Sequence, residues 1–252
     1  MNTLIKLPIT LMLILSFSGC NMEADKEKKT PKNTIFIGID VSGSFTRTKR
    51  FKDAMAFLGE YVWAHLENKG RLSKPKDLYI GGIGGNVKED PQAFFPIHDF
   101  IGKSPKEITK KLLQEFGGQK DNLTDFNTYF LRVKSIVKQK NLVLAPISII
   151  MITDGVPEIA GRSKQAVKQA YSRISIKPLE YLARNISIRI LYAGPRVGNN
   201  WRTYVPTKRV RIWTVEPEVM YGWQEQKKRN GQKGLWNWIA DNIDLRIQSR
   251  GL

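Results

Sequence analysis

The chain has 252 residues and a formal net charge of +18, because 41 lysines and arginines outnumber 23 aspartates and glutamates. Its single cysteine and two histidines exclude a disulfide framework and a His/Cys zinc cluster. The excess of positive charge attracts polyanions, but it also keeps a surface solvated, so it does not name a partner by itself.

The N-terminus predicts export. Lys6 precedes an apolar stretch, residues 7–17, that is too short to span a bilayer, and Cys20 follows shortly after it. Small residues before a cysteine resemble a bacterial lipobox, in which the thiol carries a diacylglycerol. We therefore expect a lipoprotein signal peptide over residues 1–19, a lipidated Cys20 that starts a polar tether over 20–33, and one domain over 34–252. An ordinary signal peptide with an incidental cysteine is the alternative.

The first strand of the domain ends in a cluster of polar residues. The apolar run 35–39 predicts a buried strand, and Asp40, Ser42 and Ser44 follow it directly. These side chains then lie at the carboxyl end of a strand, where open α/β sheets bind ligands. One carboxylate with neutral hydroxyls suits Mg²⁺. An Asx or hydroxyl N-cap on the helix that starts near Phe45 would explain the same residues.

Strands and helices are expected to alternate through the rest of the chain, which predicts an α/β fold with a doubly wound, mostly parallel central sheet flanked by helices. The expected helices are 46–68, 106–116, a segment from Phe126 to Val137, 163–182 with a break near Pro178, and a C-terminal helix containing Leu235 to Ile243. The expected strands are 77–86, 142–153, 186–192 and 210–215, and residues 86–104 form an elongated connection.

A second carboxylate repeats the pattern of the first. Asp154 follows the apolar run 147–152 and Thr153, so two carboxylates at two strand ends can share one ion. Between the last two strands, residues 193–208 combine aromatic side chains with Arg196, Arg202 and Lys208. Such a loop is a candidate for stacking on bases or binding an anionic partner, and a packed surface loop is the alternative.

The residues Asp40-x-Ser42-x-Ser44 after a strand, then Thr124, then Asp154 in Ile-Thr-Asp-Gly, resemble the metal-ion-dependent adhesion site of von Willebrand factor type A (VWA) domains. The resemblance covers roughly residue 34 to the C-terminus and implies a Rossmann-like VWA fold. It implies that Ser42, Ser44 and Thr124 offer hydroxyl oxygens to Mg²⁺ or Mn²⁺, while Asp40 and Asp154 act directly or through water. Asn-Leu precedes Thr124 where the family often has glycines.

We therefore expect a binding module, not an enzyme, whose ion is completed by an acidic residue of a protein partner. Its lipid anchor places it on a membrane of the bacterial cell envelope, on the periplasmic or outer surface. A haloacid dehalogenase-type enzyme also has an aspartate after its first strand, but Ser42 stands where that class typically has a second acidic residue. The other alternative is an envelope protein that binds nucleic acid or anionic lipid through its basic surface.

Overall fold

A computed structural model describes residues 33–84, 94–117, 124–143, 146–159, 161, 163–182 and 185–244. These residues belong to one compact unit, Pro31–Leu252. The predicted signal peptide, Cys20 and the tether up to residue 32 lie outside the described residues. Within the described ranges, every helix is too short or too polar to cross a membrane.

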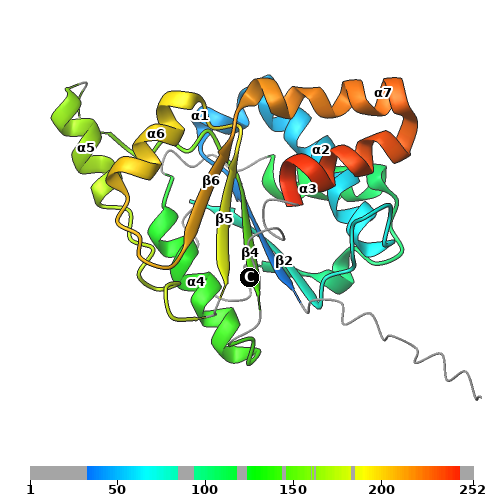
Figure 1. The fold of residues 1–252 in the computed structure, drawn as a ribbon, viewed down its shortest axis with the longest axis horizontal. Helices are drawn as coiled ribbons and strands as arrows, with labels where there is room; N and C mark the ends of the chain where they lie inside the picture. Colours follow the sequence, from blue (N-terminus) through cyan, green and yellow to red (C-terminus); the bar gives the residue numbers. More distant parts are fainter. Residues whose placement is uncertain are drawn as a thin grey trace, which may run out of the picture. The chain divides into compact units, whose positions relative to one another are not determined.

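The described strands form one six-stranded sheet in the order β3-β2-β1-β4-β5-β6 (Figure 1). Every neighbouring pair is parallel except β2 and β3. The mostly parallel α/β sheet predicted from the sequence is therefore confirmed. The strands are β1 (Thr34–Asp40), β2 (Asp77–Ile83), β3 (Phe94–Pro96), β4 (Ile147–Ile152), β5 (Ile186–Leu191) and β6 (Arg211–Val215).

Helices cover both faces of the sheet, as the buried isoleucine-rich runs of β1, β4 and β5 require. One core joins the first face to α1 (Gly43–Thr46), α2 (Lys49–Leu66), α3 (Pro105–Phe116) and α7 (Pro217–Ile239). A second core joins the opposite face to α4 (Phe126–Gln139), α5 (Lys164–Ser172) and α6 (Pro195–Tyr204). Two further short turns of helix are η2 (Ile97–Asp99) and η3 (Ala240–Asp244).

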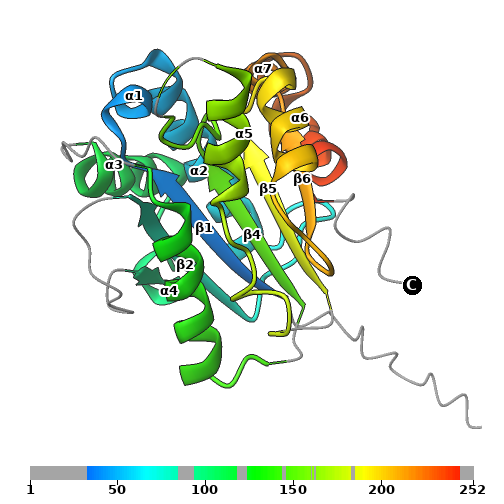
Figure 2. The same ribbon diagram turned by 90° about the vertical axis from the view of Figure 1, so that its left-hand side faces the viewer.

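The strand order reverses between β1 and β4. From β1 the chain continues to β2 on one side, and from β4 it continues to β5 on the other side. The two connections therefore leave in opposite directions at the carboxyl ends of these strands, which opens a crevice between them. Figure 2 shows α1 beyond the arrowheads of β1 and β4, at this edge of the sheet.

Several expected boundaries were wrong. The helix expected over 46–68 is divided into α1 and α2, and the helix expected over 163–182 ends at Ser172. The connection expected over 86–104 contains β3 and η2, which the sequence pattern missed because three residues ending in proline carry no alternation. Residues 193–208, expected as a loop, contain α6.

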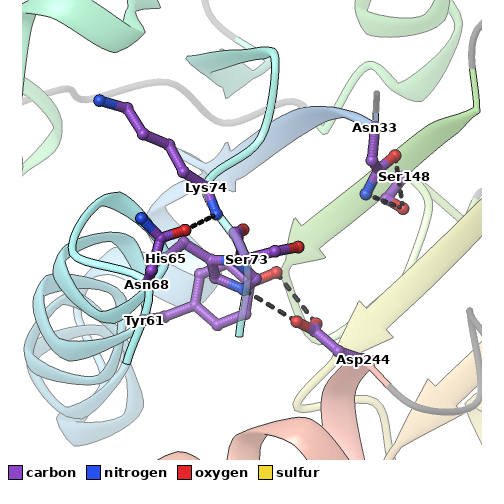
Figure 3. Close-up of polar contacts among 8 residues, drawn as sticks. All are labelled: Asn33, Tyr61, His65, Asn68, Ser73, Lys74, Ser148 and Asp244. Atoms are coloured by element: carbon purple, nitrogen blue, oxygen red, sulfur yellow. Dashed lines mark hydrogen bonds and ion pairs between the residues drawn. The ribbon is translucent and has the colours of Figure 1, made fainter. Parts of the chain in front are cut away.

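The C-terminal end of the described chain is held against α2 by a buried polar cluster (Figure 3). His65 Nε2 lies 2.8 Å from Asp244 Oδ2, and His65 Nδ1 lies 2.9 Å from the carbonyl oxygen of Ser73. Tyr61 donates to the other oxygen of Asp244. Burial acts to lower the pKa of His65, but the charge and hydrogen bond of Asp244 outweigh it, so the pKa is raised. The contact with Asp244 therefore stabilises the charged form of the imidazole relative to the neutral form.

Candidate metal centre

Asp40 ends β1 and is fully buried at the carboxyl edge of the sheet. Its Oδ1 accepts a hydrogen bond of 2.9 Å from the backbone N–H of Ser42, and its Oδ2 accepts one of 2.6 Å from the Thr153 hydroxyl. Because Thr153 directly follows β4, the carboxylate is tied to both strands that flank the crevice. Its position is set by the sheet and not by a flexible loop.

The two serines continue from this carboxylate towards solvent. Ser42 is buried and Ser44 is exposed, and their hydroxyl oxygens lie 3.0 Å apart. Ser42 is the N-cap residue of α1, but its side chain makes no capping hydrogen bond. The alternative in which the Ser42 hydroxyl caps the helix is therefore wrong, whereas the hydrogen bond from the backbone N–H of Ser42 to Asp40 has the i, i+2 form of an Asx turn. A pair of neutral oxygens instead stands beside a buried negative charge.

Asp154 lies two residues beyond the end of β4 and is partly buried. Its Oδ1 accepts a hydrogen bond of 3.0 Å from the backbone N–H of Val156. Burial raises the pKa of Asp154, and the hydrogen bond from Val156 and the positive charge of Arg50 act against it. The N-terminus of α2, which contains Arg50, is therefore near enough to influence this carboxyl group.

The two carboxylates are close enough to repel each other. Burial raises the pKa of Asp40, the hydrogen bonds from Thr153 and Ser42 lower it, and the charge of Asp154 raises it again. No lysine, arginine or histidine of the described ranges forms an ion pair with Asp40. The described cations therefore do not pair directly with the buried carboxyl group of Asp40.

Thr124 lies at the same edge, but within the described ranges no hydrogen bond connects it to the other four predicted ligands, which are Asp40, Ser42, Ser44 and Asp154. It is partly buried and precedes Asp125, whose Oδ1 accepts from the backbone N–H of Thr128. Asp125, not Thr124, is thus the N-cap of α4, and the N-cap alternative for Thr124 is wrong. Because α4 leads into β4, its N-terminus points to the carboxyl edge.

The donor set fits a hard divalent cation. Asp40, Asp154 and the two serines offer only oxygen atoms, which suit Mg²⁺ or Mn²⁺ with several retained waters. In the described part of the chain, no three or more His, Cys, Asp or Glu side chains gather in a way that could hold a metal. Because the donors of this edge are all oxygen atoms, they suit a hard cation better than a softer metal that prefers nitrogen or sulfur.

Sequence reasoning missed Thr153 and Arg50. The Thr153 hydroxyl accepts from the backbone N–H of Gly155 while it donates to Asp40, so it couples the Asp154 loop to β1. Its position next to Asp154 was a usable signal. Arg50 gave no such signal, because only the packing of α2 brings it near Asp154.

The basic residues predicted between the last two strands do not form a stacking loop. Arg196 and Arg202 are exposed on α6, and Lys208 is exposed in the following turn. Six residues apart on one helix, the two arginines project about 120° away from each other. Trp201 is fully buried and donates from Nε1 to the carbonyl oxygen of Gly155, so it is not available to stack on a base. The prediction is therefore wrong for Trp201, whereas Tyr204 is only partly buried.

No protein-family model matches the chain, and no curated protein matches it. Similar solved structures include the human COPII-coat protein Sec24c, with a TM-score of 0.42, 12% identity, and coverage of 82% of this chain and 33% of that chain. The SpRpn10 VWA domain has a TM-score of 0.43, 9% identity, and coverage of 81% of this chain and 94% of that domain.

The pilus adhesin SpaC from Lactobacillus rhamnosus GG, in its open conformation, has a TM-score of 0.42, 11% identity, and coverage of 83% and 31%. This chain thus spans 33% of Sec24c and 31% of the adhesin. These similarities do not indicate what this chain binds.

Proposed function

We propose that the chain is a VWA-like binding module that holds Mg²⁺ or Mn²⁺ at the carboxyl edge of its sheet and uses the ion to bind an acidic residue of a protein partner. One observation carries this proposal: Asp40 is fully buried, lies near enough to Asp154 to be affected by its charge, and forms no ion pair with a described residue. A buried carboxylate is costly unless it is compensated. A divalent cation at this edge would compensate both carboxylates.

The gradient of exposure supports a binding role for such an ion. Asp40 and Ser42 are buried, Asp154 is partly buried, and Ser44 is exposed. Ligands on the protein side are therefore anchored, while the outer side of the site is open to solvent. A bound ion supplies an electrophilic point for a carboxylate oxygen, and the hydroxyl of Thr124 is the proposed further ligand. The chain's own residues orient the ion and leave that outer side free.

The surroundings of the site support a protein as the partner. Val156, in the loop after Asp154, and Val219 and Tyr221, in the first turns of α7, are exposed apolar side chains at the same edge. The Tyr221 ring packs at 6.2 Å from that of Tyr192, which in turn packs on Phe45 of α1. Exposed apolar and aromatic residues around a charged centre are typical of a protein interface.

The proposed setting is the bacterial cell envelope, with the domain tethered to the membrane through a lipid on Cys20. The alternative function is the binding of polyanions through Arg196, Arg202 and Lys208, which is favoured by their exposure and by the net charge of +18. The two functions respond to different reagents. Binding through phosphate contacts weakens steeply as salt rises, whereas binding through the ion is lost in chelator.

Titration calorimetry of the full chain with MgCl₂ and MnCl₂ tests the metal site. We expect one ion to bind to the wild type, Asp40→Ala to abolish binding, and Ser44→Ala to weaken it less, because water can replace one neutral ligand. Asp241→Asn is the matched control, since this exposed carboxylate pairs with Arg71 elsewhere. Equal affinity of the wild type and Asp40→Ala would show that the ion binds elsewhere or not at all.

A second measurement tests the use of the ion. The wild type and Asp40→Ala are used to capture partners from native envelope extract, with and without chelator and at low and high salt. The proposal expects a partner that is lost both in chelator and with Asp40→Ala. A partner that is retained in chelator but released by salt would instead support the basic surface as the binding site.

A further inference from the structure

A groove separate from the metal-site residues lies where α2, α3 and α7 meet. It has a volume of about 630 Å³. Each helix contributes side chains from one face, such as Lys106 and Lys110 of α3, one turn apart, and Trp223 and Lys227 of α7, also one turn apart. The face of α3 with Ile108, Leu112 and Phe116 is buried in the core. On the groove side, Thr109 donates to the carbonyl oxygen of Met55, so α2 forms one wall of the groove.

The groove carries an excess of positive charge. Three lysines line it, Lys106, Lys110 and Lys227, together with one acidic residue, Glu60 of α2. Lys227 forms an ion pair with Glu60 Oε1, whereas Lys106 and Lys110 form no ion pair with a described residue. An anionic group placed between them would be stabilised by charge-assisted hydrogen bonds.

One carboxylate oxygen of Glu60, near these lysines, has no hydrogen-bond donor among the described residues. The Glu60 side chain is only 8% exposed, and this oxygen, Oε2, is buried. A buried carboxylate oxygen without a donor is unfavourable, so a donor brought by a ligand would be bound well. Lys227 covers this carboxylate with a side chain that is 39% exposed, and its flexible stem can turn to admit such a donor.

The floor of the groove is apolar. Leu113 of α3 packs against the core beneath it, and Trp223 of α7 is almost fully buried. The Trp223 Nε1–H already donates to Asp53, so the ring offers the groove an apolar surface and no free donor. An alkyl chain on Leu113 and Trp223 would gain free energy in proportion to the apolar area that it removes from water.

The size of the groove favours a small ligand over a protein. Its volume lies within the range of small-molecule sites, about 300–1,000 Å³. None of the large hydrophobic side chains that are exposed in the described ranges lines it, so it lacks the apolar surroundings of a protein interface. A ligand that satisfies all three features needs an anionic head, a hydrogen-bond donor beside it and a single apolar chain.

We propose that the α2–α3–α7 groove binds a single-chain amphiphile of the lysophospholipid type. Its phosphate is held by Lys106, Lys110 and Lys227, its free hydroxyl donates to Glu60, and its alkyl chain lies on Leu113 and Trp223. Binding is non-covalent and needs no metal. The site is therefore independent of Asp40 and Asp154.

Calorimetry of the full chain with lauroyl lysophosphatidate, kept below its micelle concentration, tests the proposal. Three probes each remove one feature: dodecyl phosphate lacks the hydroxyl, dodecyl maltoside lacks the charge, and glycerol phosphate lacks the chain. We expect one molecule of the lysophosphatidate per chain and weaker binding of every other probe. Absence of saturable binding, or equal affinity for dodecyl maltoside, would overturn the proposal.

Two variants locate the binding. Lys110→Gln should weaken binding of the lysophosphatidate roughly three- to tenfold, because it removes one charge-assisted contact of an exposed side chain. The matched control is Lys138→Gln, on α4 across the sheet, which should change nothing. Leu113→Glu should abolish binding by placing a negative charge on the floor, and circular dichroism checks that it folds. Equal affinity of Lys110→Gln and the wild type would overturn the proposal.

Two further measurements distinguish this groove from the metal site and from a membrane surface. Asp40→Ala should bind the lysophosphatidate as the wild type does, so failure of the metal site leaves this result unchanged. Vesicles of phosphatidylcholine with diacyl phosphatidate test a membrane surface as the source of the phosphate. Binding that depends on Lys110 for vesicles, but is absent for the monomeric lysophosphatidate, would contradict a single-chain ligand.

Discussion

Replacing Asp40 by asparagine removes the buried charge and keeps the size of the side chain. The remaining side-chain oxygen can still accept from the backbone N–H of Ser42, and the Thr153 hydroxyl can turn to accept from the new amide. Without a metal, the substitution relieves burial of an unpaired charge and its repulsion by Asp154. With a metal, it removes the most buried ligand. The two conditions should therefore shift the stability of the variant in opposite directions relative to the wild type.

The expected magnitudes follow from these contacts. In chelator, loss of the buried charge outweighs two weakened hydrogen bonds, and we expect Asp40→Asn to be more stable by about 1–2 kcal/mol. For the wild type, Mg²⁺ at about a hundred times its Kd adds about 2.7 kcal/mol. In a domain of this size, 1 kcal/mol corresponds to roughly 2–4 °C in Tm. The wild type should thus melt below the variant in chelator and above it in Mg²⁺.

Differential scanning calorimetry in chelator and in a Mg²⁺ series measures this crossing. Asp241→Asn is the control, because it removes an exposed negative charge from the same strongly basic protein and should keep the Mg²⁺ response. A variant less stable than the wild type in chelator would show that the protein itself compensates the Asp40 carboxylate. An equal rise of Tm for the wild type and Asp40→Asn in Mg²⁺ would show that the ion does not bind at Asp40.

His65→Gln should lower the free energy of unfolding by about 3 kcal/mol at pH 6, because it breaks a buried ion pair. Since the pKa of His65 is raised in the folded state, the stabilisation by this pair is complete below the unfolded pKa and is lost as pH rises through the folded pKa. Urea unfolding of the wild type and the variant from about pH 5.5 to 9 checks this, and a difference that grows with pH contradicts it. Cys20→Ser should release the protein from membranes or leave an unprocessed precursor, as cell fractionation would show; unchanged fractionation with normal processing excludes the anchor. Neutralising Arg196, Arg202 and Lys208 together should weaken binding to nucleic acid or anionic vesicles and reduce the log–log salt slope by about one per lost phosphate contact, whereas a functionless solvated face predicts no change in a salt titration.

Much of the fold could be predicted because its local patterns are strong. The continuous apolar runs of β1 and β4 predict buried strands, and the helical spacing of apolar residues in α2 and α4 predicts amphipathic helices. β3 could not be predicted, because three residues that pair with one edge of β2 are defined by their partner and not by their own pattern. The same holds for α6, whose buried side rests on Trp201 and Gly198 among polar neighbours.

The candidate site was predictable as a set of residue types but not as a geometry. Asp40 and Asp154 were identified from their positions after two apolar runs, and Ser42 and Ser44 from their spacing. That the Thr153 hydroxyl bridges to Asp40 across 113 positions depends on the parallel pairing of β1 with β4. No local pattern specifies that pairing, because strand order is decided by which distant segments bury the most apolar surface together.

The sequence by itself determined the strands and helices that have a strong apolar pattern, such as β1, β4, α2 and α4, and which carboxylates and hydroxyls follow β1 and β4, because these features depend on the local period of apolar residues. Tertiary structure alone decided that Asp40 is fully buried and repelled by Asp154, that Trp201 is inside the core, and that three lysines meet at one groove. These are properties of contacts between residues far apart in the chain. Their chemistry arises only when β1 and β4 pair and when α2, α3 and α7 cover the same face of the sheet.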